Sequence, residues 1–330
     1  MPPIFIATRG SALALAQANM VLAQCHSAFP AVSFELKIIK TTGDKLQTAS
    51  LAQESKTLPK GLFTKELEVA LLEGQADLAV HSLKDLPTDL PTGLKLGAVA
   101  KRADVRDVLI YRDASFFKTD PSSPKAGRKG FKPNLKVQEL PAGAVVATSS
   151  TRRRAQLLAL HPSLKAPDIR GNVLTRIQKV AQKSEIDATL LALAGITRLN
   201  YRINDDGRLL GEQVPEGILA SVLGLDVMLP CVGQGAIGLE VREGDTRIGE
   251  ICERLNHIET FQCVTAERAF LAGMGGGCQS PVAAYAQIEA GKLQIQALSF
   301  ASGPVRRAKA AGSPEDAADL GRQIAAELKA

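Results

Sequence analysis

Short apolar runs alternate with helical stretches through the first two thirds of the chain. Residues 4–7, 34–39 and 77–82 have the pattern of strands, and residues 11–23 and 64–73 have the spacing of helices. Such alternation predicts an open α/β sheet with helices on its faces. Ligands of these sheets bind outside the carboxyl ends of the strands, so the residues that follow each strand are the first candidates for a functional site.

The same alternation starts again after residue 143. Residues 144–147, 168–169 and 188–193 are predicted strands, and residues 150–160 and 173–183 are predicted helices. A length of 330 residues fits two domains of ordinary size or three smaller ones. The sequence therefore predicts two consecutive α/β units.

The pattern changes near residue 259. A helix is predicted over residues 260–271, and a glycine cluster at 275–277 follows it. Strands over 282–286 and 293–298 come next, and a final helix is predicted over 314–329. This part of the chain predicts a third, smaller α+β domain.

Composition excludes several classes of protein. Hydrophobic residues make up 45% and charged residues 22%, close to globular averages, which excludes disordered, collagen-like and coiled-coil proteins. No apolar run approaches the ~18 residues of a membrane-spanning helix, so no membrane partner is expected. The N-terminal stretch 11–23 lacks a preceding charged segment and is interpreted as a helix, not a signal peptide.

The five cysteines are an odd number and contain no C-x-x-C pair. Neither a disulfide framework nor a metal site is therefore expected, and a reducing compartment fits best. Cys278 follows three glycines, which would let a bulky group approach the backbone. An inert cysteine is the better reading of the local chemistry alone, and a covalent attachment point is the alternative.

Most of the net charge of +6 comes from one segment. Residues 120–136 contain five basic residues and one acidic residue, which gives +5 − 1 = +4, together with several prolines and glycines. We expect a low-complexity loop that is solvated and dispensable for activity over residues 121–132. A basic rim that steers anions is the competing reading.

Arginines follow the ends of predicted strands or lie in the first turns of predicted helices. They are Arg9, Arg152, Arg153, Arg170, Arg176 and Arg198. Helix N-termini favour anions, and a guanidinium adds a bidentate match for carboxylate or phosphate. Any single arginine is best explained as a surface residue in a weak ion pair. Their recurrence in both α/β units predicts a polyanionic ligand.

Asp85 follows the strand predicted at residues 77–82, and Pro87 prevents a helix from starting there. A carboxylate at that edge among arginines can stabilise a developing cation and move protons. A capping or turn aspartate is the alternative. His81, within the apolar alternation of the strand, is interpreted as a hydrogen-bonded core histidine.

Residues 233–238 match the dinucleotide-binding pattern G-x-G-x-x-G in the wrong context. The pattern should follow a strand and open a helix, whereas Pro230 precedes it and a strand pattern follows. Close backbone approach, or a chain crossing between domains, is the better interpretation of these glycines.

Seven sequence blocks occur in a fixed order. They are residues 7–11 (ATRGS), 60–68 (KGLFTKELE), 80–87 (VHSLKDLP), 148–153 (TSSTRR), 170–172 (RGN), 232–236 (VGQGA) and 276–278 (GGC). Together they closely resemble the porphobilinogen deaminase family, also called hydroxymethylbilane synthases. The resemblance runs from residue 4 to about residue 286, which is nearly the whole chain.

The resemblance implies two lobes like those of periplasmic binding proteins around a cleft, plus a small α+β domain. The implied boundaries are 1–103 with 233–256 for domain 1, 104–232 for domain 2 with the basic loop 120–136 inserted, and 257–330 for domain 3. It also implies a transferase of tetrapyrrole biosynthesis. Four porphobilinogens would be added head to tail with loss of ammonia, and hydrolysis would release hydroxymethylbilane.

The resemblance also implies the residues of the site. Cys278 would carry a covalent dipyrromethane cofactor, and Asp85 would be the catalytic carboxylate. The implied cofactor-binding residues are Lys84, Thr148, Ser149, Ser150, Arg152, Arg153, Arg170, Gly171 and Gln234. The implied substrate-binding residues are Arg9, Ser11, Gln17, Lys56, Lys60, Phe63, Arg176 and Arg198.

The resemblance further implies a cytoplasmic monomer that passes its product to uroporphyrinogen-III synthase. One departure is Gly275, where the family commonly has an acidic residue. Two alternatives of other classes are a non-catalytic anion-binding module and a nucleic-acid binder that uses the basic loop. The second is disfavoured because only 4% of the residues are aromatic and none is Trp, which leaves few stacking surfaces.

Overall fold

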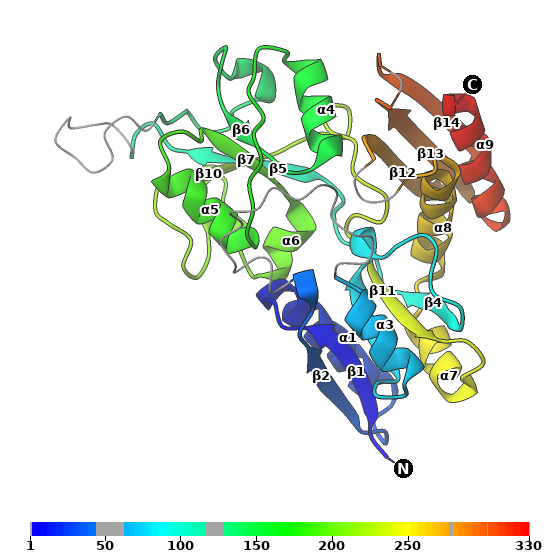
Figure 1. Ribbon diagram of the computed structural model, residues 1–330. Helices are drawn as coiled ribbons and strands as arrows, with labels where there is room; N and C mark the ends of the chain where they lie inside the picture. The colour runs from blue at the N-terminus through cyan, green and yellow to red at the C-terminus, as the bar shows by residue number, and fades with distance from the viewer. Residues whose placement is uncertain (1, 44–62, 117–128, 277–279, 302, 330) are drawn as a thin grey trace.

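The structure is a computed structural model that describes residues 2–43, 63–116, 129–276, 280–301 and 303–329. Two α/β lobes and a smaller α+β unit make up the molecule, at the bottom, the upper left and the upper right of Figure 1. The fold class expected from the sequence is therefore confirmed. The exact domain boundaries stay a prediction.

The first lobe is built on a five-stranded sheet. Its order is β2 (Phe34–Ile39), β1 (Ile4–Arg9), β3 (Leu78–Ser82), β11 (Ile237–Arg242) and β4 (Leu94–Val99). β1 is parallel to β2 and β3, whereas β11 is antiparallel to β3 and β4. The carboxyl ends of β1 and β3 therefore meet at one edge of a mixed sheet.

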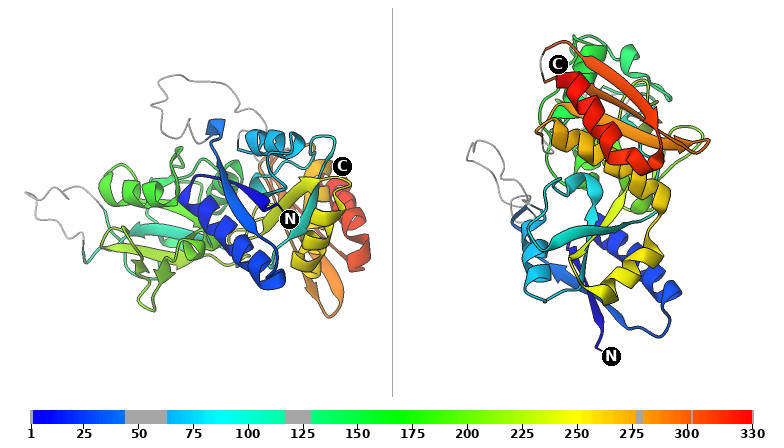
Figure 2. Two further views of the ribbon diagram at one scale, coloured as in Figure 1. Left: turned by 90° about the horizontal axis from the view of Figure 1, so that it is seen from below. Right: turned by 90° about the vertical axis from the view of Figure 1, so that its right-hand side faces the viewer.

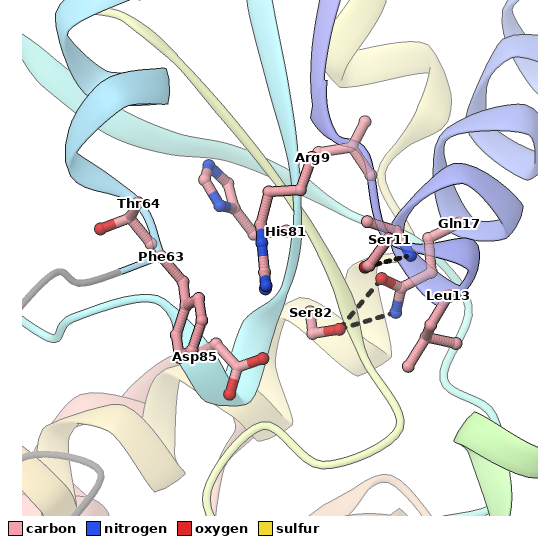
Figure 3. Close-up of a pocket in the computed structure, with 11 residues that line it drawn as sticks. Arg9, Ser11, Leu13, Gln17, Phe63, Thr64, His81, Ser82 and Asp85 are labelled. Atoms are coloured by element: carbon pink, nitrogen blue, oxygen red, sulfur yellow. Dashed lines mark hydrogen bonds between the residues drawn. The ribbon is translucent and has the colours of Figure 1, made fainter. Parts of the chain in front are cut away.

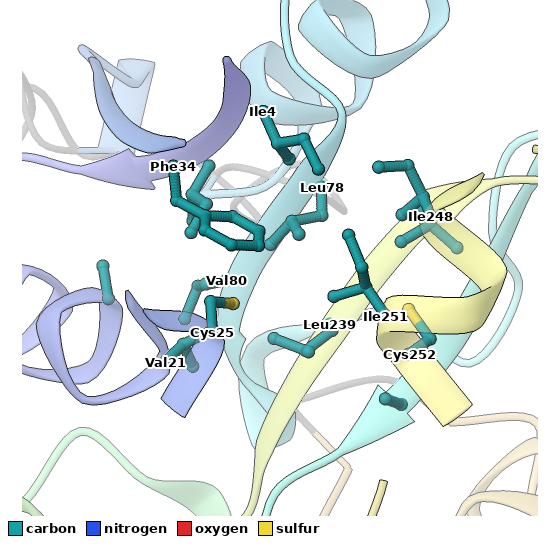
Figure 4. Close-up of a cluster of buried hydrophobic side chains, with 14 of the residues drawn as sticks. Ile4, Val21, Cys25, Phe34, Leu78, Val80, Leu239, Ile248, Ile251 and Cys252 are labelled. Atoms are coloured by element: carbon teal, nitrogen blue, oxygen red, sulfur yellow. The ribbon is translucent and has the colours of Figure 1, made fainter. Parts of the chain in front are cut away.

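Helices cover both faces of this sheet. The first face carries α1 (Ala12–Ala28) and α7 (Thr246–Leu255), and the opposite face carries α3 (Lys65–Leu72). Figure 4 shows the core under α1 and α7, where Cys25 and Ile251 from the helices face Leu78 and Leu239 from the strands. Burial of these apolar side chains holds the strand ends, and thus the site, in place.

The second lobe has a four-stranded sheet in the order β10 (Ile218–Val222), β5 (Asp107–Arg112), β7 (Ala188–Ala192) and β6 (Val146–Ala147). Its helices are α4 (Thr151–Leu160), α5 (Val173–Gln182) and α6 (Leu193–Arg198), and a small hairpin joins β8 (Arg202–Ile203) to β9 (Leu209–Leu210). β6 and β7 are parallel, whereas β5 is antiparallel to both of its neighbours.

The strand expected at residues 168–169 is wrong. Ile169 is buried, but its backbone bonds to a side chain instead of a strand. Its N–H donates to Ser149 Oγ at 3.0 Å, and its carbonyl accepts from the same hydroxyl at 2.8 Å. One side chain thus satisfies both backbone groups of this buried residue.

The third unit packs two helices on an antiparallel sheet. The sheet consists of β12 (Val282–Glu289), β13 (Lys292–Ser299) and β14 (Arg306–Gly312), and the helices are α8 (Ile258–Gly273) and α9 (Ala317–Lys329). The right-hand view of Figure 2 shows α8 and α9 side by side on the sheet. The final helix starts later than expected, because residues 314–316 form a separate 3₁₀ turn.

Two crossover segments join the lobes. One runs from β4 to β5, and the other returns from β10 to β11. They touch where Ala103 N–H donates to the Gly235 carbonyl at 3.1 Å. Gly235 has φ +82°, and a Cβ atom there would lie 2.6 Å from the Ala103 carbonyl oxygen. The interpretation of the 233–238 glycines as a chain crossing is therefore confirmed.

The expectation that residues 121–132 are wholly solvated is wrong at its C-terminal end; residues 117–128 lie outside the described residues. Phe131 exchanges backbone hydrogen bonds with the end of β5, and its ring packs edge-on against Tyr111. The buried Arg112 donates from Nε to the Lys129 carbonyl at 2.7 Å. These contacts hold residues 129–131 against the second lobe.

Within the described ranges, no helix has the length and apolar character needed to cross a bilayer. Across the same residues, no three His, Cys, Asp or Glu side chains gather as a metal-binding group.

Candidate active site

Asp85 lies just past the carboxyl end of β3, in a single 3₁₀ turn over Leu83–Asp85. Leu83 and Leu86 on either side of the turn are buried, and Leu83 N–H donates to the Ala236 carbonyl at 3.1 Å. The turn is therefore anchored to the second crossover segment. The Asp85 carboxylate is left half-buried and faces a pocket.

This pocket lies between the end of β3 and the start of α1 (Figure 3). Of the sequence-predicted residues, it is lined by Arg9, Ser11, Gln17, Phe63 and Asp85. The guanidinium of Arg9 stacks over the Phe63 ring at 4.2 Å from its centroid, a cation–π contact. Figure 3 shows Arg9 and Asp85 pointing toward one another across the pocket.

The first turn of α1 shapes the other wall. Ser11 is the N-cap and accepts from the Ala14 N–H at 3.4 Å, so the helix begins at Ala12, three residues after Arg9. The buried Gln17 amide donates to and accepts from the Ser82 hydroxyl at 2.9 and 3.0 Å. This pair ties α1 to the end of β3.

His81 is buried on β3, and its Nε2 lies 2.9 Å from Glu240 Oε2. The interpretation of His81 as a hydrogen-bonded core histidine is confirmed.

Arg152 and Arg153 lie in the first turn of α4, whose N-cap Ser150 accepts from the Arg153 N–H. Both side chains are buried and share the carboxylate of Asp107, at 2.8 Å from Arg152 and 2.7 Å from Arg153. Burial by itself would raise the pKa of Asp107, but the two guanidinium charges outweigh it and hold this pKa well below its usual range.

Arg176 and Arg198 differ from this pair because no carboxylate among the described residues forms an ion pair with either. Burial, followed by the charge of Arg153, lowers the pKa of Arg176 to about 10, and Asp85 acts in the opposite direction. Burial lowers the pKa of Arg198 to about 10. Both remain protonated at pH 7, and a ligand carboxylate would relieve the cost of burying them.

Backbone contacts position these two arginines. Arg176 Nε donates to the Gly171 carbonyl at 2.8 Å, and one terminal nitrogen of Arg198 donates to the Gly235 carbonyl at 2.7 Å. Gly171 has φ +114°, which only glycine adopts without strain, and it precedes the α5 N-cap Asn172. Arg170 is exposed.

The remaining sequence-predicted residues surround the crossover segments and the start of α4. Buried Thr148 accepts from the Ser150 N–H at 3.2 Å, and exposed Ser149 bonds to Ile169 as described above. Gln234 is buried and donates from Nε2 to Val105 and Asp107. Lys84 is half-buried in the turn that carries Asp85.

A ligand with several carboxylates fits this arrangement. The buried Nε atoms of Arg152, Arg153 and Arg198 have no hydrogen-bond partner within the described part of the chain. Buried donors without a partner are rare, because each costs free energy until an acceptor reaches it. Two of these donors lie in the first turn of α4, after the carboxyl end of β6, and the third lies at the last residue of α6.

Comparison with protein families decides the relationship. A family described as "Porphobilinogen deaminase, dipyromethane cofactor binding domain" matches residues 4–250, and one described as "Porphobilinogen deaminase, C-terminal domain" matches residues 261–330. The chain belongs to the porphobilinogen deaminase family.

Curated members of the family align along the whole chain. The porphobilinogen deaminase of Moorella thermoacetica is 41% identical over 332 residues, covering 100% of this chain and 94% of the relative. That of Maridesulfovibrio salexigens is 41% identical over 333 residues, covering 100% of this chain and 96% of the relative. The resemblance, the transferase class and the dipyrromethane cofactor expected from the sequence are thereby confirmed.

Solved structures show more distant similarity. The periplasmic aliphatic sulphonate binding protein SsuA from Escherichia coli has a TM-score of 0.41 and 12% identity, covering 83% of this chain and 71% of that one. OxyR from Corynebacterium glutamicum has a TM-score of 0.40 and 18% identity, covering 84% of this chain and 69% of that one.

Three residues implied by the porphobilinogen deaminase resemblance, Lys56, Lys60 and Cys278, lie outside the described residues. Gly275, near the cysteine, has φ +69°, so an acidic residue there would be strained. The cysteines Cys25, Cys252 and Cys263 are buried, and burial raises the pKa of each to about 11, which keeps their thiols unreactive.

Sequence reasoning missed Asp107, Arg102 and Glu267. Arg102 makes a bidentate ion pair with the fully buried Glu267 of α8, at 2.6 and 3.0 Å, and also donates to the Gln234 carbonyl. One signal in the sequence could have indicated Asp107, which is a charged residue at the start of an apolar run. A charge in that place is expected to be buried, and buried charges are rare unless they are paired.

Proposed function

We propose that this chain condenses four porphobilinogens head to tail onto a dipyrromethane held by Cys278, with loss of ammonia, and then hydrolyses the product to release hydroxymethylbilane. The observation that carries the proposal is the Asp85 carboxylate at a strand end. Arg9 of the first lobe lines the same pocket as Asp85. The negative charge of Asp85 also acts to raise the pKa of Arg176 in the second lobe.

The cofactor would be held by Lys84, Thr148, Ser149, Ser150, Arg152, Arg153, Arg170, Gly171 and Gln234. When bound, dipyrromethane supplies a tethered pyrrole whose free α-carbon is nucleophilic. Arg152 and Arg153 can offer their unpartnered Nε donors to its carboxylates, since Asp107 already fixes the other end of each guanidinium.

Asp85 provides the negative charge that the reaction needs. As ammonia leaves the aminomethyl group of the substrate with the bonding electron pair, positive charge develops on the methylene carbon and the pyrrole ring. An ionised carboxylate fixed by the 3₁₀ turn stabilises that charge without reorganisation. The same carboxylate can accept a proton when the new carbon–carbon bond has formed.

The substrate's two acidic arms do not react, so their binding residues supply orientation. We assign this role to Arg9, Ser11, Gln17, Lys56, Lys60, Phe63, Arg176 and Arg198. Arg9, braced by Phe63, and the underpaired Arg176 and Arg198 are the described guanidinium groups best suited to substrate carboxylates.

We also propose a cytoplasmic monomer that delivers its product to uroporphyrinogen-III synthase. The buried thiols of Cys25, Cys252 and Cys263, each unbridged, support a reducing compartment.

The test replaces Asp85 with Asn. Loss of the stabilising charge should lower kcat by about 10²-fold or more, while Tm stays unchanged because Asp85 is half-buried at a turn. Denaturing mass spectrometry should find a two-pyrrole adduct on the peptide that contains Cys278.

The matched control is Asp89→Asn, four residues along the same segment and exposed, which should leave kcat unchanged. Near-normal kcat in loaded Asp85→Asn protein, or full activity in protein that carries no pyrrole, would contradict the proposal.

A further inference from the structure

The Asp107 carboxylate accepts three side-chain hydrogen bonds from described residues. It is fully buried at the start of β5. Oδ2 accepts from Arg152 at 2.8 Å, and Oδ1 accepts from Arg153 at 2.7 Å and from Gln234 Nε2 at 3.0 Å. No step of the proposed reaction uses this group.

In both Arg152 and Arg153, only part of the guanidinium group has hydrogen-bond partners. Asp107 takes one terminal nitrogen of each guanidinium, and backbone carbonyls take more donors, Leu229 from Arg152 at 2.7 Å and Leu190 from Arg153 at 3.0 Å. The buried Nε of both arginines is left without a partner in the described residues. Asp107 thus fixes each guanidinium at one end, and the Nε donor of each has no acceptor among the described residues.

The net charge of the cluster formed by Asp107, Arg152 and Arg153 also favours binding of an anion. One carboxylate between two guanidinium groups leaves a net charge of +1, so the cluster can be buried and still attract an anion. The charge of Arg153 also acts on Arg176, which has no such counterion among the described residues. Without Asp107, three cations would crowd one edge of the lobe.

Asp107 is itself held in place. Gln234 reaches it from the second crossover segment and also donates to the Val105 carbonyl at 2.6 Å. The Gln234 carbonyl accepts from Arg102 at 2.9 Å, and Arg102 is clamped by Glu267 of the third unit. The carboxylate is therefore held by Gln234 of the crossover segment in addition to the two arginines of the second lobe.

We propose that Asp107 is a positioning residue that orients Arg152 and Arg153 so that their free donors meet the carboxylates of the pyrrole chain. This inference rests on the roles given to both arginines under the proposed function. A misplacement of about 1 Å can cost on the order of 10²-fold in rate, so a shift of either guanidinium should be measurable in turnover.

The test is Asp107→Glu, which keeps the charge and moves the carboxylate by one methylene group. We expect kcat/KM per loaded molecule to fall by about tenfold or more, and the fraction of protein that carries dipyrromethane, measured by intact mass, to fall as well. The matched control is Asp113→Glu, a buried aspartate just past the other end of β5 whose side chain bonds to the nearby Ser115. It should lose Tm but keep kcat/KM within about twofold.

Three further results would overturn the positioning role of Asp107 or the role of the arginines that it orients. If both variants lose Tm equally and neither loses kcat/KM per loaded molecule, Asp107 is merely structural and the proposal fails. If Asp107→Glu does not fold, the isosteric Asp107→Asn is measured instead, and failure of both at 20 °C means that the carboxylate serves the fold alone. Arg152→Gln runs in parallel: unchanged loading and turnover there would overturn the role of the arginine itself.

Discussion

At the scale of single residues, the arginines of the site fall into two groups that the sequence cannot separate. Arg152 is paired with Asp107, which outweighs the effect of burial and raises its pKa. Arg176 and Arg198 are underpaired, and burial lowers the pKa of each to about 10. The first group is held by a buried carboxylate, whereas the second is held by the backbone carbonyls of Gly171 and Gly235.

Glu68 offers a stability prediction with a definite sign. Burial, opposed by Thr64 and reinforced by Glu240, raises the pKa of this α3 carboxyl above its unfolded value of about 4.3. A raised carboxyl pKa means that ionisation costs stability, so the cost is absent below the unfolded pKa and grows as pH rises through the folded pKa. Glu68→Gln should therefore raise Tm at pH 7.5.

The gain should shrink as the pH approaches 4, where wild-type Glu68 is itself protonated. Thermal unfolding at pH 4 and pH 7.5 measures both values. Glu253→Gln, at an exposed site on α7, should change Tm at neither pH. A lower Tm for Glu68→Gln at pH 7.5 would mean that the charge is favourable after all.

At the scale of elements, three of the predicted helices begin at a capping residue that is visible in the sequence. The α1, α4 and α5 helices begin after Ser11, Ser150 and Asn172, which all accept from the expected backbone N–H. The α7 helix was missed although Ile248, Ile251 and Cys252 carry a helical period.

β5 was missed for a physical reason. It starts with Asp107 and ends with Arg112, both fully buried charges. Their partners, Arg152 at one end and the Lys129 carbonyl at the other, lie far along the chain, and only the folded chain brings them together. For the same reason, the candidate site could be predicted as a set of arginines and Asp85, but its internal pairing could not.

The start of α5 gives a prediction at this scale. Gly171→Ala places a residue with Cβ at φ +114°, with that atom 2.6 Å from Thr175 Cγ2. Thr175 donates to the cap Asn172 through both its N–H and its hydroxyl at 2.9 Å, so the clash should loosen the cap. We expect a loss of about 1–2 kcal/mol of stability and a higher KM, because Arg176 bonds to the Gly171 carbonyl.

Gly143→Ala separates the two causes of that loss. Gly143 has φ +77°, and no atom lies within 4 Å of the position that an alanine methyl group would take there, so this variant reports backbone strain alone. Denaturant unfolding and steady-state kinetics of both variants give the comparison. Equal KM values for the two would show that the α5 cap does not position Arg176.

At the scale of the whole molecule, the basic segment dominates the net charge, but its C-terminal end is structural. Replacing residues 118–127 by a Gly-Ser linker removes two basic residues and one acidic residue. We expect unchanged kcat and an unchanged dependence of kcat/KM on ionic strength. A loss of kcat/KM confined to low salt would instead show electrostatic steering of the anionic substrate.

Extending the same replacement to residue 132 is the contrasting variant. It removes the Phe131 ring, which packs on Tyr111, and with it the anchored backbone that places the Lys129 carbonyl against Arg112. A buried guanidinium that loses an acceptor costs about 1–3 kcal/mol, so Tm should fall for this variant only. Equal Tm values for the short and long replacements would refute the anchoring role of residues 129–131.

The two crossover segments also dictate when the first lobe can be completed during synthesis. β11 lies between β3 and β4 in the sheet, yet the ribosome makes it only after the entire second lobe. At about 5–20 residues per second, the interval between the end of β4 at Val99 and the start of β11 at Ile237 is on the order of ten seconds. Throughout that time, β3 and β4 lack the strand that lies between them, whereas the last strand of the second lobe, β10, is made before β11. The second lobe can therefore complete its sheet before the first lobe does, although the first strands of the chain belong to the first lobe, because the first lobe must wait for the strand that joins β3 to β4.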